Sequence, residues 1–422
     1  PVWISNVAIV GGATLDTLMT GHLGSTDLAA VAIGLAVSVS VFVALVGVMQ
    51  GLSPIAGYHY GAGHHERIGF ELHQTIWLAI LLAIIGMGLM CYTPMWMTLT
   101  NSTGRVAEIA TNFLLINAIG LPAAMAGRAY MAMNAAVSRP KVAMWIALSM
   151  LAVKAVTNYI FIFGWAFIPS FGGAGCAISS TINAFLSLFL YWVIWHYDSF
   201  YAKMRQKRIS MPNRKALTNL LKLGIPIGLS AFFEVTSFTF MTIFISRLGA
   251  DVVSAHQIVA NLTSLFYMAP LAIGVTSSVL VSQSLGANSP ETARMATYKC
   301  LKFCICLAVF VSALLYFCKY FFVGLYTSDL DVIKVSTYLI GFFASIYHVF
   351  DAVNCVGSFS MRGYQITFLP MIIYGVFLWG LGLGLGSILT FTDYLSPAPM
   401  GAAGYWTAIT IGLTLSGTIV GL

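Results

Sequence analysis

The chain has 422 residues, of which 59% are hydrophobic and only 8% are charged, with a formal net charge of +7 at pH 7. Soluble domains carry about 25% charged residues because their surfaces face water. A chain this poor in charge cannot cover a water-facing surface of its size. The composition therefore excludes a soluble globular domain and indicates a surface that faces lipid.

The apolar stretches are long and continuous, and they lack the alternation of a barrel strand. Because backbone groups in lipid must be hydrogen-bonded internally, these stretches predict helices. Each crossing needs roughly 20 residues. We expect an all-α membrane protein with about twelve transmembrane helices. The expected spans are 1–20, 28–58, 68–97, 106–137, 142–168, 175–197, 217–246, 253–286, 298–324, 334–361, 366–390 and 403–422.

The basic residues gather in loops that follow even-numbered spans. The segment Tyr201–Lys215 is the richest and contains no acid. By the positive-inside rule, these loops and both termini are expected to be cytoplasmic. The positive charge is thus a topology signal, and we expect contact with the lipid bilayer and no nucleic-acid partner. The basic residues are Lys203, Arg205, Lys207, Arg208, Arg214 and Lys215, then Arg67, Arg139, Lys141, Arg294, Lys299 and Arg362 in other loops.

The chain repeats itself at a nearly constant offset. Each repeat holds six expected spans, so both copies enter the membrane from the same side, as in a parallel repeat related by an axis along the membrane normal. We expect two six-helix lobes at 1–200 and 217–422, joined by a basic cytoplasmic linker at 201–216. The matching pairs are Pro1 and Pro226, Leu23-Gly24 and Leu248-Gly249, Gly61-Ala62 and Gly286-Ala287, Pro140 and Pro370, and Gly175 and Gly404.

The repeat also bears on the chain ends. Lys222-Leu-Gly-Ile precedes Pro226 in the second copy, whereas nothing precedes Pro1 in the first. We therefore expect the chain to begin inside its first helix and to stop inside its last.

Three acids lie well inside expected spans: Asp16, Glu234 and Asp351. A charge at the bilayer centre costs at least about 2.5–3.5 kcal/mol, so such residues face a partner or a polar cavity. Each is interpreted either as a structural ion pair or hydrogen bond, or as part of an ion or substrate site. Glu234 and Phe238 share a helix face at i,i+4, as do Tyr347 and Asp351. A carboxylate beside an aromatic ring suits an organic cation or a sodium ion.

Two cations also fall inside expected spans. Lys154 precedes Asn158 by four residues on one helix face. It either neutralises Asp16 or packs against backbone carbonyls, and the sequence does not decide between them. Arg128 is close enough to a helix end that we expect its side chain to extend to the membrane surface.

Several segments resemble the NorM branch of the MATE (multidrug and toxic compound extrusion) transporters. Pro226–Val235 closely resembles the opening of that family's seventh helix, and Leu15–Gly24 its first helix. The similarity runs essentially from Pro1 to the end. The other similar segments are Ala255–Pro270 (eighth helix), Asp351–Tyr364 (tenth) and Gly172–Cys176 (sixth).

The resemblance implies a two-lobed antiporter that expels cationic, amphipathic drugs and dyes against an inward flow of Na⁺ or H⁺. It implies no cofactor besides that cation, a monomer and a prokaryotic inner membrane. By position, the acids linked to coupling are Glu234 and Asp351, with Tyr347 beside them. Asp16, Phe238, Tyr267 and Gln257 match substrate or cavity residues, and Asn158 with Lys154 matches a first-lobe polar cluster. We interpret the second lobe as the holder of the coupling ion, and Asp16 with the aromatics as drug contacts.

The chain departs from the family at two positions, since Lys154 replaces a common asparagine and Leu280 replaces a frequent arginine. Three rivals stay open. A flippase for lipid-linked oligosaccharides would line its cavity with several Arg or Lys, whereas the acids dominate here. An intramembrane enzyme would need a catalytic cluster, which the sequence does not contain, and a passive channel has no need of two diverged lobes.

Overall fold

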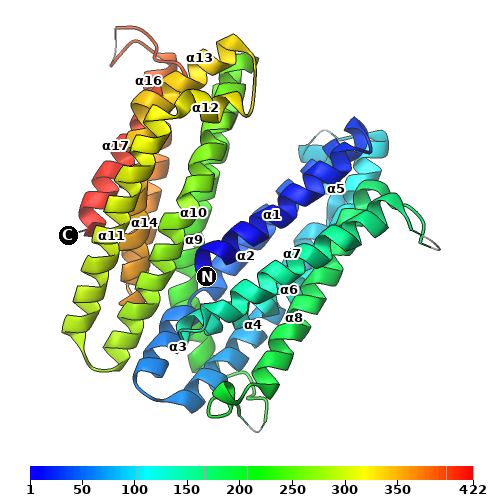
Figure 1. Ribbon diagram of the computed structural model, residues 1–422, viewed down its shortest axis with the longest axis vertical. Coiled ribbons are helices and arrows are strands. Elements are labelled where there is room, and N and C mark those ends of the chain that lie inside the picture. Colours follow the sequence, from blue (N-terminus) through cyan, green and yellow to red (C-terminus); the bar gives the residue numbers. More distant parts are fainter. Residues whose placement is uncertain (101, 166–167, 207, 396, 422) are drawn as a thin grey trace. The chain divides into compact units, whose positions relative to one another are not determined.

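The computed structural model describes residues 1–100, 102–165, 168–206, 208–395 and 397–421, which form helices joined by short loops (Figure 1). Among these residues, 12 helical segments are long and apolar enough to cross a membrane. The expected all-α architecture with twelve spans is confirmed. Lys207 of the basic segment lies outside the described residues.

The helices divide into two compact units, 1–228 and 229–422, and the division falls within one helix, α9. In the first unit, α6 packs against α2, α4 and α8, and buried side chains such as Leu72, Met125 and Trp195 fill the core between them. The elements of this unit are α1 (Val2–Gly21), α2 (Ser25–Met49), α3 (Leu52–Gly61), α4 (His65–Cys91), α5 (Thr93–Leu99), α6 (Gly104–Ala136), α7 (Pro140–Phe163), η1 (Gly172–Ala174), α8 (Gly175–Tyr197), η2 (Ser199–Tyr201) and the start of α9 (Arg214–Ile245).

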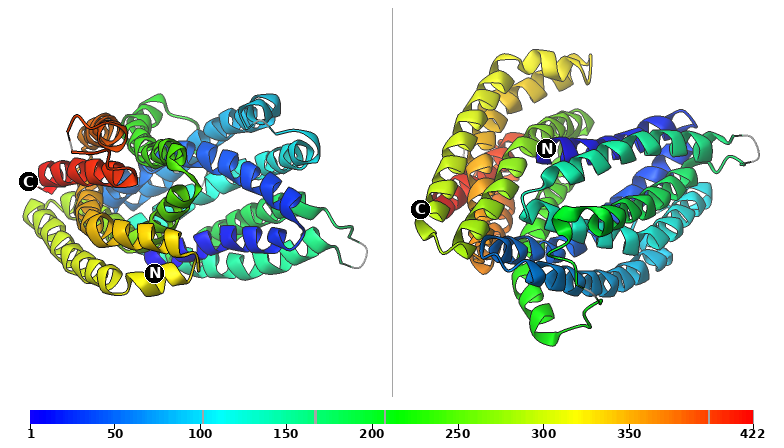
Figure 2. Two further views of the ribbon diagram at one scale, coloured as in Figure 1. Left: turned by 90° about the horizontal axis from the view of Figure 1, so that it is seen from above. Right: turned by 60° about the horizontal axis from the view of Figure 1, so that its bottom comes forward.

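In the second unit, α14 packs against α10, α11 and α17 (Figure 2), and Tyr405 and Trp406 are its largest fully buried side chains. Two π-helical stretches, η4 and η5, interrupt the tenth and eleventh spans. After α9, the elements are η3 (Ser246–Leu248), α10 (Ala250–Gly286), α11 (Pro290–Phe317), α12 (Lys319–Gly324), α13 (Leu330–Leu339), η4 (Ile340–Ala344), α14 (Ser345–Gly363), α15 (Phe368–Ile373), η5 (Tyr374–Leu383), α16 (Gly384–Phe391) and α17 (Ala402–Gly421).

The internal repeat is visible in the backbone. Residues at matching positions of the two copies adopt the same unusual positive φ, a conformation that glycine reaches at little cost. Both members of the first pair precede a long helix of their unit. The repeat is therefore structural as well as sequential. The pairs are Gly24 (129°) with Gly249 (112°), Gly63 (73°) with Asn288 (55°), and Gly172 (58°) with Gly401 (60°).

Several span boundaries differ from the sequence prediction. The ninth span begins at Pro290 and not at 298, because proline suits the first position of a helix and a helix can extend beyond the bilayer. Arg294 and Lys299 were expected in a loop and instead lie within α11. Arg362, also expected in a loop, lies in the last turn of α14 with 8% of its surface exposed.

The second span is divided into α2 and α3 at Gly51. A Cβ atom on this residue would come within 3.0 Å of the Leu220 carbonyl oxygen on α9. Glycine therefore permits a close approach between the two backbones within the first unit.

The basic segment after α8 is held against α4. The Trp77 indole donates to the Ser210 carbonyl at 3.0 Å, and the Gln74 amide donates to the Met211 carbonyl at 2.9 Å. Asn213 then caps α9, since its side-chain oxygen accepts from the backbone N–H groups of Lys215 and Ala216. This cap starts α9 at Arg214, earlier than the expected 217.

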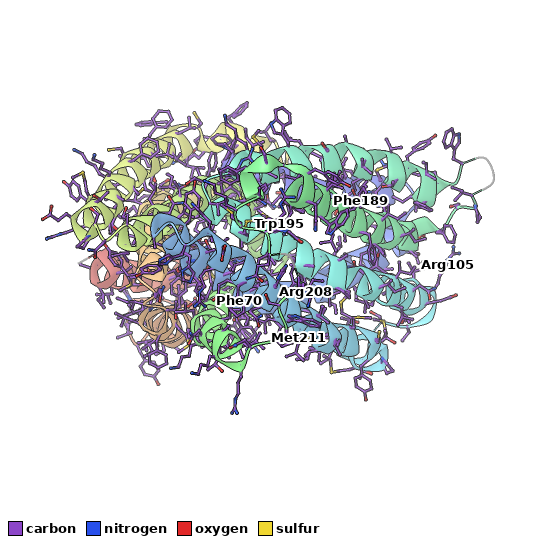
Figure 3. The ribbon with its side chains drawn as sticks, turned by 90° about the horizontal axis from the view of Figure 1, so that it is seen from below. Phe70, Arg105, Phe189, Trp195, Arg208 and Met211 are labelled. Carbon is purple, nitrogen blue, oxygen red and sulfur yellow. The ribbon has the colours of Figure 1, made fainter. Side chains whose placement is uncertain are left out.

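Large apolar side chains cover much of the outside of both units. Phe189 on α8 is 56% exposed (Figure 3), and Ile84 on α4 is 62% exposed. Exposed apolar surface on this scale is unfavourable in water and suits contact with lipid.

Candidate functional site: two polar clusters

The first cluster lies inside the first unit, where α1, α7 and α8 meet. Asp16 on α1 is 1% exposed. The Lys154 ammonium on α7 lies 2.8 Å from Asp16 Oδ2, and Asn158, one turn along α7, donates to Asp16 Oδ1 at 2.8 Å. Lys154 also donates to the Ser180 hydroxyl on α8 at 2.9 Å.

This geometry decides between the two interpretations of Lys154: it neutralises Asp16. Each carboxylate oxygen of Asp16 has a partner within the first unit, the Lys154 ammonium on one and the Asn158 amide on the other. A buried carboxylate is retained where a nearby cation and a hydrogen-bond donor compensate its charge, as Lys154 and Asn158 do here. The expectation that drugs contact Asp16 stays a prediction.

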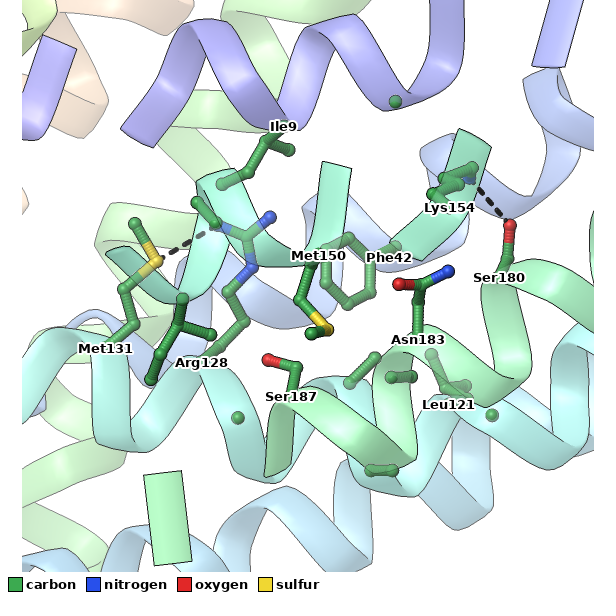
Figure 4. A pocket seen from close by; sticks show the side chains of 18 of the residues that line it. Ile9, Phe42, Leu121, Arg128, Met131, Met150, Lys154, Ser180, Asn183 and Ser187 are labelled. Carbon is green, nitrogen blue, oxygen red and sulfur yellow. Dashed lines mark hydrogen bonds between the residues drawn. The ribbon is translucent and has the colours of Figure 1, made fainter. Parts of the chain in front are cut away.

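Arg128, expected to extend to the membrane surface, is partly exposed. It lines a cavity of about 350 Å³ inside the first unit, together with Lys154 (Figure 4). Its position follows from α6, which carries it into the unit about two helical turns before the helix ends at Ala136.

The second cluster lies inside the second unit and contains two acids. Glu234 on α9 is partly exposed, whereas Asp351 on α14 is 8% exposed. The two carboxyl groups are near enough for their charges to interact. Each has a tyrosine beside it, since Tyr267 of α10 approaches Glu234 and Tyr347 approaches Asp351.

Aromatic packing joins these helices. The Phe238 ring meets the Tyr347 ring edge-to-face at 6.1 Å, and Tyr347 meets Trp406 of α17 edge-to-face at 5.5 Å. The two i,i+4 pairs read from the sequence, Glu234 with Phe238 and Tyr347 with Asp351, thus contact each other through their rings. The aromatic packing holds Tyr347 beside Asp351.

Two further residues belong to this cluster and were missed. Cys355 lies one turn after Asp351 on α14, and Tyr374 lies in η5; both are near Glu234. The i,i+4 spacing from Asp351 could have identified Cys355. No spacing pointed to Tyr374, because it comes from a different span.

Gln257 and Leu280, both on α10, lie apart from the polar groups just described. Gln257 is exposed, whereas its neighbour His256 is buried and shares a hydrogen bond of 3.0 Å with Thr242. Leu280 is 40% exposed. Within the described part of the chain, no interaction links either residue to Glu234 or Asp351.

One ion pair lies between the spans, where Arg139 pairs with Asp198 in the loop after α8. The Phe200 backbone N–H donates to Asp198 at 2.9 Å. This hydrogen bond, and then the Arg139 guanidinium, lower the pKa of Asp198. The pair joins the start of α7 to the end of α8.

The family model for MatE matches residues 1–160 and 226–388. The chain belongs to the MatE family. It is 35% identical over 429 residues to the "Probable multidrug resistance protein NorM" of Aromatoleum aromaticum, covering 100% of this chain and 91% of that protein. It is also 35% identical over 430 residues to the protein of that name in Chromobacterium violaceum, covering 100% and 90%.

Solved structures share the fold of this MatE family member. The eukaryotic MATE transporter AtDTX14 matches with a TM-score of 0.88 at 22% identity, covering 100% of this chain and 92% of that one. A MOP superfamily transporter from Pyrococcus furiosus matches with a TM-score of 0.89 at 17% identity and the same coverage. The resemblance to the NorM branch is confirmed by the curated relatives.

Family membership decides the class of protein. The MatE family member described here is an integral multi-pass membrane protein, a cation-coupled secondary transporter and not an enzyme. Among the described residues, no group of three or more His, Cys, Asp or Glu could hold a metal ion.

Proposed function

We propose that this transporter is a multidrug efflux antiporter that exports cationic, amphipathic compounds in exchange for Na⁺ or H⁺. The names of its relatives, multidrug resistance proteins, support the drug class. They do not favour the alternative, a flippase for lipid-linked oligosaccharides.

The observation that carries the coupling proposal is the acid pair of the second cluster. Asp351 is buried beside Glu234 and has no cationic side chain as an ion-pair partner among the described residues, and Arg362 of α14 is near enough to Glu234 for their charges to interact. Two neighbouring carboxylates repel each other when both are ionised, so a proton or a bound cation stabilises the pair. We therefore assign the coupling ion to Glu234 and Asp351, with the Tyr347 hydroxyl beside it.

The same groups suggest how exchange works. A proton or Na⁺ on the acid pair neutralises the charge that would otherwise favour an organic cation in the same unit. Phe238 and Tyr267 lie next to the acids and offer aromatic faces that attract organic cations. Binding of the coupling ion then favours the conformation that releases the drug, which is alternating access driven by differential affinity.

We further propose an orientation with the linker and both termini in the cytoplasm of a prokaryotic cell, from the distribution of basic residues. The proposed lobes are 1–200 and 217–422, with 201–216 as linker, and the transporter acts as a monomer. Gln257 is proposed to contact substrate from its exposed position on α10.

The test is uptake of the fluorescent cation ethidium into proteoliposomes, with an imposed Na⁺ gradient compared with an imposed pH gradient. We expect one gradient to drive transport in the wild type and neither to drive it in Glu234→Gln. Glu291→Gln, which changes an exposed acid at the start of α11, serves as the matched control and is expected to transport normally. Normal gradient-driven transport by Glu234→Gln would refute the assignment.

A further inference from the structure

The basic segment between α8 and α9 is fixed against α4 at several points. The Ser210 backbone N–H donates to His73 Nδ1 at 3.3 Å, and the Asn213 backbone N–H donates to Gln74 Oε1 at 2.7 Å. They add to the two hydrogen bonds that side chains of α4 donate to carbonyls of the segment. The backbone of residues 210–213 is therefore held in one arrangement against the helix.

The sequence of α4 indicates the depth at which this contact lies in the membrane. From Ile76 to Cys91 the helix contains only hydrophobic residues and glycine, whereas Glu66 and Arg67 precede this run. Trp77, at the start of the run, donates its indole N–H to the segment. Tryptophan is enriched where hydrocarbon meets the lipid headgroups. The contact between α4 and the segment is therefore at the level of the headgroups.

Apolar and basic side chains of the fixed segment are exposed together. Ile209 is 74% exposed and Met211 is 80% exposed. Arg208 and Arg214, which flank them in the chain, are exposed as well. In the described part of the chain, neither guanidinium forms an ion pair or a hydrogen bond. Such a combination is unfavourable in water and suits the membrane boundary, where apolar side chains enter the hydrocarbon and cations stay at the phosphates.

Positive charge exceeds negative charge on this surface. Lys203 and Lys215 are also exposed, and Tyr201–Lys215 contains no acid. Glu66 is an exposed acid at its edge, where its backbone carbonyl accepts a hydrogen bond from Gln206 at 3.5 Å. Among the described residues, Glu66 forms no ion pair with the segment. The basic side chains are therefore available to an anion from outside the chain.

An apolar track leads from this surface along α4. Ile80 and Ile84 follow Trp77 at i+3 and i+7, so they share its helix face. They are 41% and 62% exposed. An acyl chain fits along this face, while the arginine forks match the phosphate at its head.

We propose that residues 208–214 and the exposed face of α4 bind an anionic phospholipid. Arg208 and Arg214 pair with its phosphate, and Ile209 and Met211 lie beside its acyl chains. A headgroup with net negative charge, such as phosphatidylglycerol, is favoured over a zwitterionic one, because the segment has no acid for an ammonium or choline group. The inference goes beyond the proposed function, since it concerns the lipid partner and not the drug or the coupling ion.

The experiment is native mass spectrometry of the full chain in a nonionic detergent, titrated with phosphatidylglycerol or with phosphatidylcholine of the same acyl chains. We expect the wild type to bind the first phosphatidylglycerol more tightly than the first phosphatidylcholine. Arg208→Gln/Arg214→Gln should weaken phosphatidylglycerol binding by about ten- to thirtyfold, because each basic residue contributes about fivefold, and should leave phosphatidylcholine unchanged. Ile209→Ser/Met211→Ser should weaken the binding of both lipids, because it removes apolar contact.

Arg105→Gln/Lys141→Gln is the matched control, because it removes two positive charges from exposed positions of the same unit outside the segment. It should bind phosphatidylglycerol like the wild type. Added phosphatidylglycerol should raise the unfolding temperature of the wild type and of this control, and not that of Arg208→Gln/Arg214→Gln. Equal affinity of the wild type for the two lipids, or unchanged phosphatidylglycerol binding by Arg208→Gln/Arg214→Gln, would overturn the proposal.

Glycerol 3-phosphate distinguishes a lipid from a soluble phosphate compound. We expect it not to displace the bound phosphatidylglycerol, because it has no acyl chain to contact Ile209 and Met211. Displacement at concentrations similar to that of the lipid would overturn the lipid assignment. The titration needs neither an ion gradient nor a drug, so its failure is distinguishable from a failure of the proposed antiport.

Discussion

The two units carry their buried acids in different surroundings. In the first unit, Asp16 is paired with Lys154 and accepts a hydrogen bond from Asn158, so its charge is compensated within the chain. In the second unit, Asp351 has another acid, Glu234, and a tyrosine for neighbours, and the cation near this pair, Arg362, interacts with Glu234 without an ion pair to Asp351 among the described residues. A buried acid with a resident ammonium is compensated within the chain, whereas two neighbouring acids are stabilised by a proton or a bound cation.

The difference has a functional meaning because the units share one scaffold. In the repeat, Ile9 is the residue equivalent to Glu234, and Met241 is the residue equivalent to Asp16, so each unit lacks the acid of the other. The ammonium of Lys154 occupies the place at Asp16 that a mobile cation would take. On this account the first unit contains a fixed ion pair beside a cavity, and the second unit binds the exchangeable ion.

The largest expected effect is on transport. Asp351→Asn should reduce gradient-driven ethidium uptake to the passive leak, a loss of about tenfold or more, because ion and drug binding are no longer coupled. Uptake into proteoliposomes is the measurement. Asp393→Asn, an exposed acid of the same unit, is the control and should transport normally. Equal losses in both variants would point to a general effect of the substitution.

Removing the resident ammonium should cause the largest loss of stability. Lys154→Met leaves Asp16 buried and unpaired, at a cost of about 3–5 kcal/mol, measured as a fall in unfolding temperature. The double variant Asp16→Asn/Lys154→Met should recover most of this loss. If the comparison is right, Lys154→Met alone also gains stability on addition of Na⁺, which the double variant does not. A Lys154→Met protein as stable as the wild type would contradict the claim that Lys154 compensates the charge of buried Asp16.

A smaller effect is expected from Tyr347→Phe. The variant keeps the ring and its edge-to-face contacts with Phe238 and Trp406, so the free energy of unfolding should change by less than about 1 kcal/mol. Loss of the hydroxyl beside Asp351 should weaken the apparent affinity for the coupling ion by about tenfold. The concentration of ion that gives half-maximal uptake reports this change, and an unaltered value would remove Tyr347 from the ion site.

The smallest effect belongs to the ion pair outside the spans. The pKa of folded Asp198 is lowered, so its stabilisation is present above the pKa of the unfolded chain and is lost as the pH falls through the folded pKa. Asp198→Asn should lower the free energy of unfolding by less than about 1 kcal/mol at neutral pH, and the difference from wild type should vanish once the pH falls below the pKa of folded Asp198. Unfolding temperatures across this range give the measurement. If Asp198→Asn lost as much stability as Lys154→Met, burial would not explain the difference between the Arg139–Asp198 and Lys154–Asp16 pairs.

Much of the fold could be predicted, because apolar length and composition determine where helices cross a membrane. The repeat was also readable, since paired residues such as Gly24 and Gly249 serve the same turn. Helix ends, such as the start of α11 at Pro290, were predicted less accurately, because a helix continues beyond the bilayer without an apolar signal.

The site was predictable only where chemistry and spacing coincide. Glu234, Asp351 and their aromatic neighbours stand out as charges in apolar spans. The place of Arg128 in the lining of a cavity was not predicted, because its distance from a helix end does not tell which way the side chain extends. Tyr374 joins the second cluster through tertiary packing, which local spacing does not encode.

The most direct measurement compares the two clusters in one assay. Ethidium uptake with and without the driving gradient would be measured for Glu234→Gln and for the charge-neutral double variant Asp16→Asn/Lys154→Met. The account predicts that the double variant keeps its response to the gradient and that Glu234→Gln loses it. A double variant that loses the response while Glu234→Gln retains it would contradict the account.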